Sequence, residues 1–584
     1  MASEVKSRFP DVSILRQFIK DRLVYQLESI PGQKDLVFDK ELMKPLDRII
    51  GATVLKEHGV AKIFKIDPTQ KSLPGCSQRL YLVRPIIEII RHIVQQIKHE
   101  RMLNERRTYR ILLTPRKLHA CESVLEKEGV FGYVNIEEFM LDLVPLDRDV
   151  LSLELPDFLP RFYLHNDYIW LNTVAKSLTH FQSVFGQIPT VCGIGRAAKM
   201  VHELMLSMPE YQSDSQNEQL EIGKLIILDR DVDFVTPLCS QLTYEGILDD
   251  TFGIQSGYVE FNKEITGKDQ PTRVLLSNQD EIYDQIRNKH FSTVFEYLSS
   301  KVKEVQTGYD KRHSLTTVGA MKNFVSNELR DLKNRHKTLA YHIGACEVAM
   351  EKKNKSGFEE ILQVEHTLLE GIDTKENTAF IEECINRQYN CIQTLRLLCL
   401  LSLTSDGIPS KQYKSLMTQF AQSYGFEKML SLHNLRKLHI LTEQEAVLTK
   451  PLGNLAAAMA KRNTFQTLVK KLNLIPKSAE EINLKSPRDM SYVFSGAYSP
   501  LSCRLVEEIL NRDGLSGLED VTKLLPGETF CSIRSRIPKG KPGSRPDYPA
   551  ARVVMVFFLG GCTFSEIAAL RILGREKGLF LNYI

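Results

Sequence analysis

Three aspartates at alternate positions form the most chemically suggestive stretch of the sequence. In "LIILDRDVDFVTPL" (225–238) an apolar run leads into Asp229, Asp231 and Asp233, with Arg230 between the first two. On an extended chain this alternation would project all three carboxylates to one side. Carboxylates grouped in this way can serve phosphate or metal chemistry, and they can also pair with an arginine where a fold needs a polar corner.

The enzymatic interpretation of this cluster rests on Asp231 and Asp233. With Val235 they give Asp-x-Asp-x-Val after an apolar strand, which resembles the first motif of haloacid-dehalogenase-type phosphatases. There one aspartate attacks phosphorus and the next acts as general acid beside a magnesium ion. That chemistry also needs a later lysine and a distant acidic pair, and "LDD" (248–250) follows too soon to be the pair. We therefore favour a structural cluster, in which Arg230 and the acids pair and cap backbone at a strand end, and keep a phosphohydrolase as the alternative.

Other chemical patterns are weaker. "GIGRAAK" (193–199) matches Gly-x-Gly-x-x-Ala, which can place a pyrophosphate at a helix N-terminus, but no strand ending in an acid follows about twenty positions later. A tight turn explains both glycines.

His342 and Cys346, four apart on a predicted helix, would be half a zinc site, and no complementary pair is in view. The EF-hand spacing also lacks its glycine and glutamate. We predict no enzyme, no metal and no cofactor.

Composition limits the class of protein. A chain of 584 residues is too long for one hydrophobic core, so two to four domains are expected. The formal net charge of +4 argues against a nucleic-acid partner. Eleven cysteines without a CxxC pair fit buried thiols in a reducing compartment. With no signal peptide and no apolar run of about 20 residues, we expect a cytoplasmic protein whose membrane association is indirect, through partners.

The elements that would position these residues follow an alternating order at first. In residues 1–147, continuous apolar runs are each followed by a helical pattern, which predicts a doubly wound parallel sheet. The runs are "KDLVFD" (34–39), "RLYLVRP" (79–85) and "YRILLTPRK" (109–117).

A second α/β domain is predicted around the acidic cluster. Helical patterns at 170–186 and 188–206 lead to the strand "KLIILD", after which residues 279–441 are almost entirely helical. Strand character returns in "SYVFSGAYSP" (491–500) and "ARVVMVFFLGG" (551–561). A lone late strand cannot bury itself, so we expect it to rejoin the second sheet. The predicted domains are 1–147, then 148–257 with 486–584, with a mainly helical domain at 258–485 inserted between these two pieces.

The helical block contains two candidate interaction surfaces. One is a heptad seam that packs inside a helical hairpin or, on the hairpin's outer face or tip, holds a partner helix. Its residues are Val325, Leu329, Leu332, His336, Leu339, Ile343 and Cys346. The other is an apolar cluster in 415–438, mostly core, in which an exposed aromatic would anchor an interface: Phe420, Tyr424, Phe426, Met429 and Leu430.

The stretch "LIILDRDVDFVTPLCSQLTYEGILDDTFGI" (225–254) resembles the signature of the Sec/Munc (SM) family of SNARE regulators. "PRDMSYVFSGAYSPLSCRLVEEIL" (487–510) and "FFLGGCTFSEIAALRILGREKG" (557–578) are similar to later segments of the family, and "KNFVSNELRDLK" and "HIGACE" to its vacuolar branch. The shared signature residues are Asp229, Arg230, Asp233, Thr236, Pro237, Leu238, Thr243, Tyr244, Glu245 and Asp249.

This resemblance implies a three-domain arch in which the acidic cluster is structural. It implies that the hairpin, about 300–350 here, grips Qa and R SNARE motifs through Val325, Leu329, Leu332, His336 and Leu339. It further implies a helical-repeat partner of the vacuolar sorting protein 16 class, called VIPAR, recruitment by small GTPases, and work at late endosomes or lysosomes. By resemblance, the VIPAR docking surface includes Met417, Phe426 and Met429. A pure scaffold without SNARE contact is a further alternative.

Two departures from the family pattern bear on these expectations. Near the hairpin tip, where many members carry a proline, this chain has "SNELRDL" (326–332), which favours a continuous helix. The sequence ends at "GLFLNYI", where the family continues through a further strand and a closing helix. We therefore expect the second sheet to be less covered here than in the family.

Overall fold

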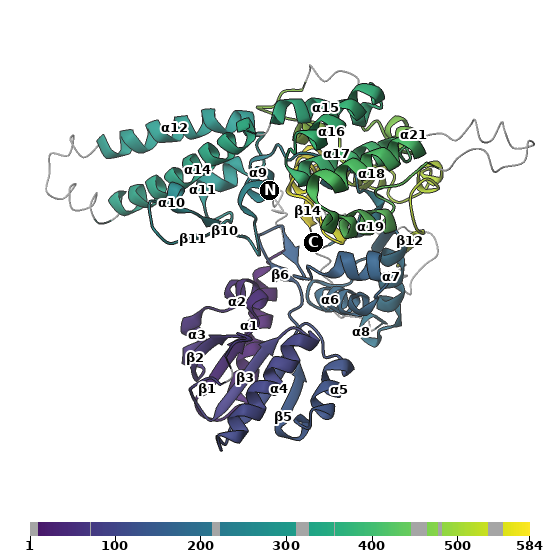
Figure 1. Ribbon diagram of the computed structural model, residues 1–584. Helices are drawn as coiled ribbons and strands as arrows, with labels where there is room; N and C mark the ends of the chain where they lie inside the picture. Colours follow the sequence, from purple (N-terminus) through teal and green to yellow (C-terminus); the bar gives the residue numbers. More distant parts are fainter. Residues whose placement is uncertain are drawn as a thin grey trace, which may run out of the picture.

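Two α/β domains and a helical domain form an arch. The computed structural model describes residues 10–70, 72–212, 222–310, 326, 328–355, 357–444, 464–476, 482–534 and 553–583. Figure 1 shows the first sheet at the lower end of the molecule, the second sheet above it, and helices at the upper end. The predicted fold class, two α/β domains with a mainly helical domain inserted into the second, is confirmed.

The first sheet is fully parallel, in the order β2-β1-β3-β4-β5. Apolar side chains from alternate strand positions fill a core on each face, one under α1, α2 and α3 and the other under α4 and α5. The strands are β1 (Lys34–Phe38), β2 (Val60–Lys65), β3 (Gln78–Val83), β4 (Thr108–Leu113) and β5 (Val134–Glu138). The helices are α1 (Ser13–Glu28), α2 (Met43–Ile49), α3 (Ala52–Glu57), α4 (Ile87–Met102) and α5 (His119–Lys127).

The second sheet has the order β12-β8-β9-β13-β14. Its strands β8 (Thr190–Ile194), β9 (Lys224–Asp229), β13 (Val553–Leu559) and β14 (Phe580–Tyr583) run parallel, and β12 (Thr529–Ile533) pairs antiparallel at the edge. The late apolar strand β13 thus lies beside β9. Helices α6 (Ile169–Phe185) and α7 (Arg196–Ser207) pack on one face, and α22 (Leu501–Asn511) and α24 (Phe564–Lys577) on the other. Short elements complete this domain: the hairpin β6 (Val144–Pro145) and β7 (Leu151–Ser152), α8 (Pro209–Gln212) and α23 (Glu519–Thr522).

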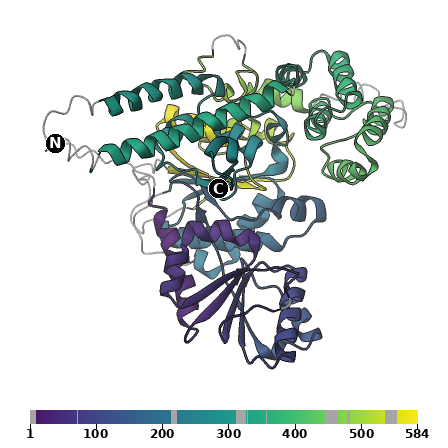
Figure 2. The ribbon, with the colours of Figure 1, turned by 60° about the vertical axis from the view of Figure 1, so that its left-hand side comes forward.

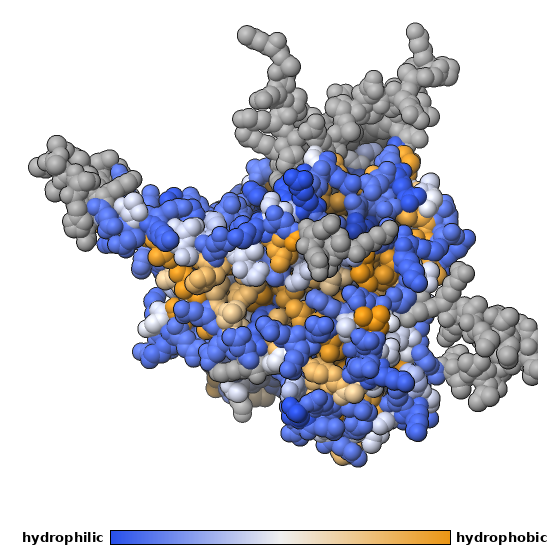
Figure 3. All heavy atoms as spheres, turned by 90° about the horizontal axis from the view of Figure 1, so that it is seen from above, coloured by the Kyte–Doolittle hydropathy of each residue, from blue (hydrophilic) through white to orange (hydrophobic). Residues whose placement is uncertain are grey.

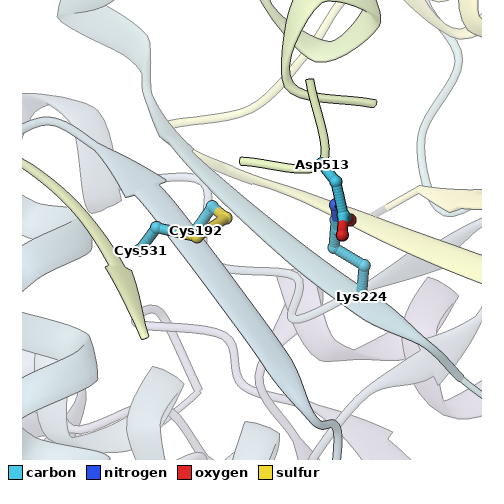
Figure 4. Close-up of a disulfide and its surroundings, with 4 residues drawn as sticks. All are labelled: Cys192, Lys224, Asp513 and Cys531. Carbon is cyan, nitrogen blue, oxygen red and sulfur yellow. A yellow bond between two sulfur atoms is a disulfide. The ribbon is translucent and has the colours of Figure 1, made fainter. Parts of the chain in front are cut away.

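Two sequence-based expectations about the second domain are wrong. The predicted strand at 491–500 begins as a 3-10 helix, η12 (Met490–Phe494), because the Asp489 side chain accepts the Ser491 N–H at 2.8 Å and starts a turn. The cysteines are not all thiols, because Cys192 of β8 and Cys531 of β12 form a disulfide (Figure 4). Antiparallel pairing places these two residues directly opposite each other, which no spacing along the chain could reveal.

The inserted helices form a projecting pair and a compact bundle. Helices α12 (Phe291–Asp310) and α14 (Leu329–Lys355) lie side by side and project from the body; we call this pair the arm (Figures 1 and 2). At its base are α9 (Tyr244–Phe252), α10 (Lys263–Thr266), α11 (Glu281–Ile286) and the hairpin β10 (Tyr258–Phe261) and β11 (Thr272–Leu275). The bundle contains α15 (Phe358–Glu370), α16 (Thr374–Asn386), α17 (Cys391–Thr404), α18 (Ser410–Tyr424), α19 (Met429–Lys437) and α21 (Thr464–Leu472). Among the described helices, none has both the length and the apolarity to cross a bilayer.

Candidate functional site

The first aspartate of the cluster closes a helix N-terminus. Strand β9 ends at Asp229, whose two carboxylate oxygens accept the N–H groups of Ala197 and Ala198, each at 2.7 Å, in the first turn of α7. An anion at this position also interacts favourably with the helix dipole. Gly195, at φ +120°, allows the close approach, because a Cβ there would lie 2.2 Å from Asp229 Cγ. The carboxylate fills the place that a pyrophosphate would need, which explains the glycine pattern of 193–199 without a nucleotide.

Arg230 reaches a partner far along the chain. A 3-10 turn, η4 (Arg230–Val232), follows β9 directly, so the three carboxylates diverge instead of sharing one side. The buried Arg230 guanidinium donates to both oxygens of Glu566, at 2.9 and 3.0 Å. Glu566 also caps the start of α24 with Thr563. Arg230 therefore connects β9 to the helix that follows β13.

Asp233 is fully occupied by structural hydrogen bonds. Its oxygens accept from the Thr236 N–H at 2.9 Å, the Thr236 hydroxyl at 2.6 Å and the Ser502 N–H at 3.0 Å at the start of α22. Buried among these donors, Asp233 is not placed to exchange protons with a substrate. This geometry speaks against the phosphohydrolase alternative.

Asp231, the second aspartate of the phosphohydrolase alternative, is half-buried. Burial raises its pKa to about 6, and one of its oxygens has no hydrogen-bond partner among the described residues. The described part of the chain contains no group of three His, Cys, Asp or Glu side chains that could hold a metal ion.

The second half of the signature fixes the base of the arm. Thr243 caps α9 by accepting the Gly246 N–H, and the hydroxyl of the buried Tyr244 lies 2.7 Å from Nδ1 of His342 on α14. The other ring nitrogen of His342 lies 3.0 Å from a carboxylate oxygen of Asp280. Both His342 nitrogens are therefore engaged in contacts that pack α14 on the base of the arm.

Glu245 extends the same network to the second sheet. It accepts a hydrogen bond from the Tyr283 hydroxyl and lies 3.5 Å from Arg571 of α24. Arg571 also binds Asp149 through two hydrogen bonds of 2.8 and 3.0 Å. We use the name "the joint" for Asp229, Arg230, Asp233, Tyr244 and Glu245 together with Glu566, His342 and Arg571. The remaining signature residues shape nearby turns: Thr236 and Pro237 start a 3-10 helix, and Asp249 accepts the Ile254 N–H at 2.8 Å.

Sequence reasoning identified the signature residues of the joint but not the residues that they pair with. Glu566, Arg571 and Asp280 are brought to the signature only by the fold. One signal for Glu566 was present, because Thr563-x-x-Glu566 is a capping-box spacing before an apolar helix.

The predicted SNARE-contact residues have different positions in the arm. Leu339 is buried between the helices, where another chain could not reach it, and Leu332 packs close to Gly308 of α12. Leu329 is half-buried, and His336 is exposed beside the ring of Tyr309. Val325 lies outside the described residues.

Two exposed apolar residues on α12 of the arm were not predicted. Phe295 is 75% exposed and Val302 is 44% exposed. They lie seven residues apart on α12 and so share one face. Figure 3 views the molecule from above and shows apolar side chains along the projecting arm.

The cluster at 415–438 separates into core and surface. Phe420 is buried, whereas Phe426 is 74% and Leu430 68% exposed, and Met429 is also exposed. Gly425, at φ +98°, ends α18 and turns the chain so that the following residues leave the bundle core. Met417 is half-buried against the core. We call Phe426, Met429 and Leu430 the patch.

Comparison with known proteins shows which family has this architecture. The model of the family described as "Sec1 family" matches residues 34–582. The chain belongs to the Sec1 family. It is 45% identical to vacuolar protein sorting-associated protein 33B of Mus musculus, over 97% of this chain and 94% of that protein. It is 35% identical to vacuolar protein sorting-associated protein 33A of Rattus norvegicus, over 100% and 96%.

Solved structures of Sec1-family proteins share the fold at low sequence identity. The SM protein Vps45 in complex with the Qa SNARE Tlg2 superposes with a TM-score of 0.59 at 15% identity, covering 97% of this chain and 95% of that chain. The Unc18–syntaxin 1 complex from Monosiga brevicollis gives a TM-score of 0.59 at 19% identity, covering 97% and 96%.

Proposed function

We propose that this chain regulates SNARE-mediated docking and fusion of vesicles in late endosomal and lysosomal trafficking, and that it holds SNARE motifs on the arm. The names of the vacuolar sorting relatives support the trafficking role. Two structural neighbours are complexes with a Qa SNARE and with syntaxin 1, which supports SNARE partners. The observation that carries the proposal is the apolar face formed by Phe295 and Val302 on a projecting helix.

The arm has the dimensions of a template for helices. Helix α14 has 27 residues, about 40 Å at 1.5 Å per residue. A SNARE helix that lies along such a surface is recognised through apolar anchors spaced by one or two turns. Aligning a Qa and an R helix in register lowers the entropic cost of starting a four-helix bundle.

A template must keep its shape when it binds, and the base of the arm is built for this. The buried contacts of Tyr244 and His342 connect α9 to α14, and Gly344 of α14 packs closely on Ile265 of α10. Because these groups are buried and paired, moving the arm would expose unsatisfied polar groups. Pre-organisation of this kind reduces the cost of binding.

The patch has a separate role in the proposal. Its exposed side chains are suited to a helical-repeat partner of the vacuolar sorting protein 16 class, VIPAR. Large apolar residues at the centre of an interface contribute most of its binding energy. Such a partner would carry the chain to late endosomal or lysosomal membranes.

Binding of isolated SNARE motifs tests the proposal. We expect the full chain to retain Qa and R motifs in a pull-down, with or without the helical-repeat partner. Phe295→Asp with Val302→Asp should weaken retention at least about tenfold, since each charge desolvated in an apolar contact costs more than ~1 kcal/mol. Tyr25→Asp is the matched control, because Tyr25 of α1 is 72% exposed and lies outside the arm. Equal retention by the double variant would refute the arm as the binding surface, and no retention by the wild type under either condition would favour the pure scaffold.

A further inference from the structure

The free end of the first α/β domain carries exposed apolar side chains next to arginines. Met102 is 80% and Leu103 55% exposed at the end of α4, and Phe131 and Tyr133 are exposed before β5. Figure 1 shows this domain at the lower end of the molecule, away from the arm and the bundle. We propose that these four residues, with Arg101 and Arg106, contact the surface of a membrane that contains anionic lipids. We call the six residues the tip.

The fold brings the two segments of the tip together. Strands β4 and β5 are parallel neighbours that pair Tyr109 with Val134, so the residues just before them lie at the same end of the sheet. The Arg101 guanidinium lies 3.4 Å from the centre of the Tyr133 ring, which joins the end of α4 to the segment before β5. The apolar side chains therefore form one surface, although about thirty positions separate the segments in the sequence.

The turn after α4 keeps its side chains on the outside. Leu103 donates its N–H to the His99 carbonyl at 3.1 Å, and Asn104, at φ +58°, donates to the Arg101 carbonyl at 3.0 Å. The Glu105 N–H bonds to the Glu100 carbonyl at 3.0 Å. These bonds close the helix end and fix the backbone, so Met102 and Leu103 cannot turn inward without breaking them.

The charges that remain available at the tip are positive. Nearby Glu105 and Glu128 are engaged by Arg107 and Lys98, at 2.7 and 2.6 Å. Arg101 and Arg106 are exposed, and no ion pair joins either of them to a described carboxylate. Glu126 and Lys127, adjacent on α5, are both exposed and carry opposite charges. Guanidinium groups that lack an ion-pair partner and lie beside aliphatic and aromatic side chains are the combination that binds the headgroup region of anionic membranes.

The size of the tip favours a membrane over a protein partner. Stable protein interfaces involve roughly 20–30 residues on each side, whereas a peripheral membrane contact can combine a few inserted side chains with basic residues. A single weak contact of this kind would orient a protein that is already recruited by partners. The inference thus adds a direct membrane contact to the indirect association expected from the sequence, and it does not depend on SNARE binding.

Flotation of the full chain with vesicles tests the inference. The probes are vesicles of pure phosphatidylcholine and vesicles with about 30% phosphatidylserine, at low and high salt. We expect association with the anionic vesicles that weakens at high salt, and little association with the neutral ones. We expect Met102→Asp with Leu103→Asp to lower anionic-vesicle binding at least about tenfold, because these changes place charges where apolar side chains would insert. A separate variant, Arg101→Glu with Arg106→Glu, should also lower binding at least about tenfold, since one basic residue contributes roughly fivefold.

The controls separate a membrane contact from a protein interface and from a loss of folding. Ile392→Asp removes a similarly exposed apolar side chain, 63% exposed on α17 of the bundle, and should leave flotation unchanged. All variants should unfold at the wild-type temperature, because the altered side chains are exposed. No flotation of the wild type, or equal flotation of the tip variants, would overturn the inference. So would a result in which the tip variants float normally but lose binding to a purified protein partner, since the tip would then be a protein interface.

Discussion

The joint and the patch reverse the usual distribution of residues in a globular protein. In the joint, Arg230, Asp233 and Glu566 are charged and buried, whereas in the patch Phe426 and Leu430 are apolar and exposed. The buried charges have hydrogen-bonding partners, and these bonds hold strand and helix ends in fixed positions. The exposed apolar groups have no such partners within the described part of the chain. The difference indicates that the conspicuous acidic signature maintains the frame, and in the proposed function binding belongs to the exposed apolar surfaces of the patch and the arm.

The largest effect on the frame is expected from Arg230→Ala. This change leaves Asp233 and Glu566 buried without their counter-ion, and breaking a buried pair in this way costs about 3–5 kcal/mol. We expect urea unfolding of the full chain to move to a clearly lower midpoint. Arg330→Ala, on the exposed surface of α14, should change stability by less than about 0.5 kcal/mol. Equal midpoints for the two variants would show that the buried charges do not hold the frame.

A smaller, pH-dependent effect is expected from His290 at the base of the arm. Its ring lies 3.0 Å from the Ser495 hydroxyl, and burial, helped by Lys353, lowers its pKa from 6.5 to about 4. The unfolded chain therefore binds more protons between pH 6.5 and 4. The contribution of His290 is complete above pH 6.5 and is lost as the pH falls, by at most about 1.4 kcal/mol per pH unit.

The test is the pH dependence of unfolding in His290→Asn. The variant should lose stability less steeply than the wild type between pH 6.5 and 4. His433→Asn, which changes an exposed histidine of α19, should keep the wild-type slope. A wild-type slope in His290→Asn would mean that this histidine is not held neutral in the folded chain.

The smallest effect on stability, together with a complete effect on binding, is expected at the patch. Phe426→Asp with Met429→Asp should abolish co-purification with the helical-repeat partner and change the free energy of unfolding by less than about 1 kcal/mol in total. Phe18→Asp, which alters an exposed residue of α1, should leave co-purification intact. A large loss of stability would instead make the two residues part of the core.

Local patterns predicted the elements that bury continuous apolar runs, and they failed where distant residues decide the structure. The runs at 34–39, 79–85 and 109–117 became β1, β3 and β4, and "ARVVMVFFLGG" became β13 beside β9. The less apolar β2 and β5 at the sheet edges were missed, because their exposed positions weaken the apolar signal.

In the candidate site, too, local patterns predicted the residues within one stretch and failed for their distant partners. Asp229, Arg230 and Asp233 could be read from one stretch, and the residues themselves favoured a structural role that the resemblance to a family also implied. Their partner Glu566 is 336 residues from Arg230, and the disulfide partners are 339 residues apart, so neither pairing could be read from spacing. The exposure of Phe295 and the burial of Leu339 also depend on how α12 meets α14, which the heptad pattern leaves undecided.

Amide hydrogen exchange of the full chain, with and without a saturating Qa SNARE motif, separates the roles of frame and surface. If the arm binds SNARE motifs while the joint only supports it, amides of α12 around Phe295 and Val302 will exchange more slowly in the complex, and those of residues 225–238 will not change. Protection confined to residues 225–238, or no protection of α12 in a complex that does form, would contradict this account.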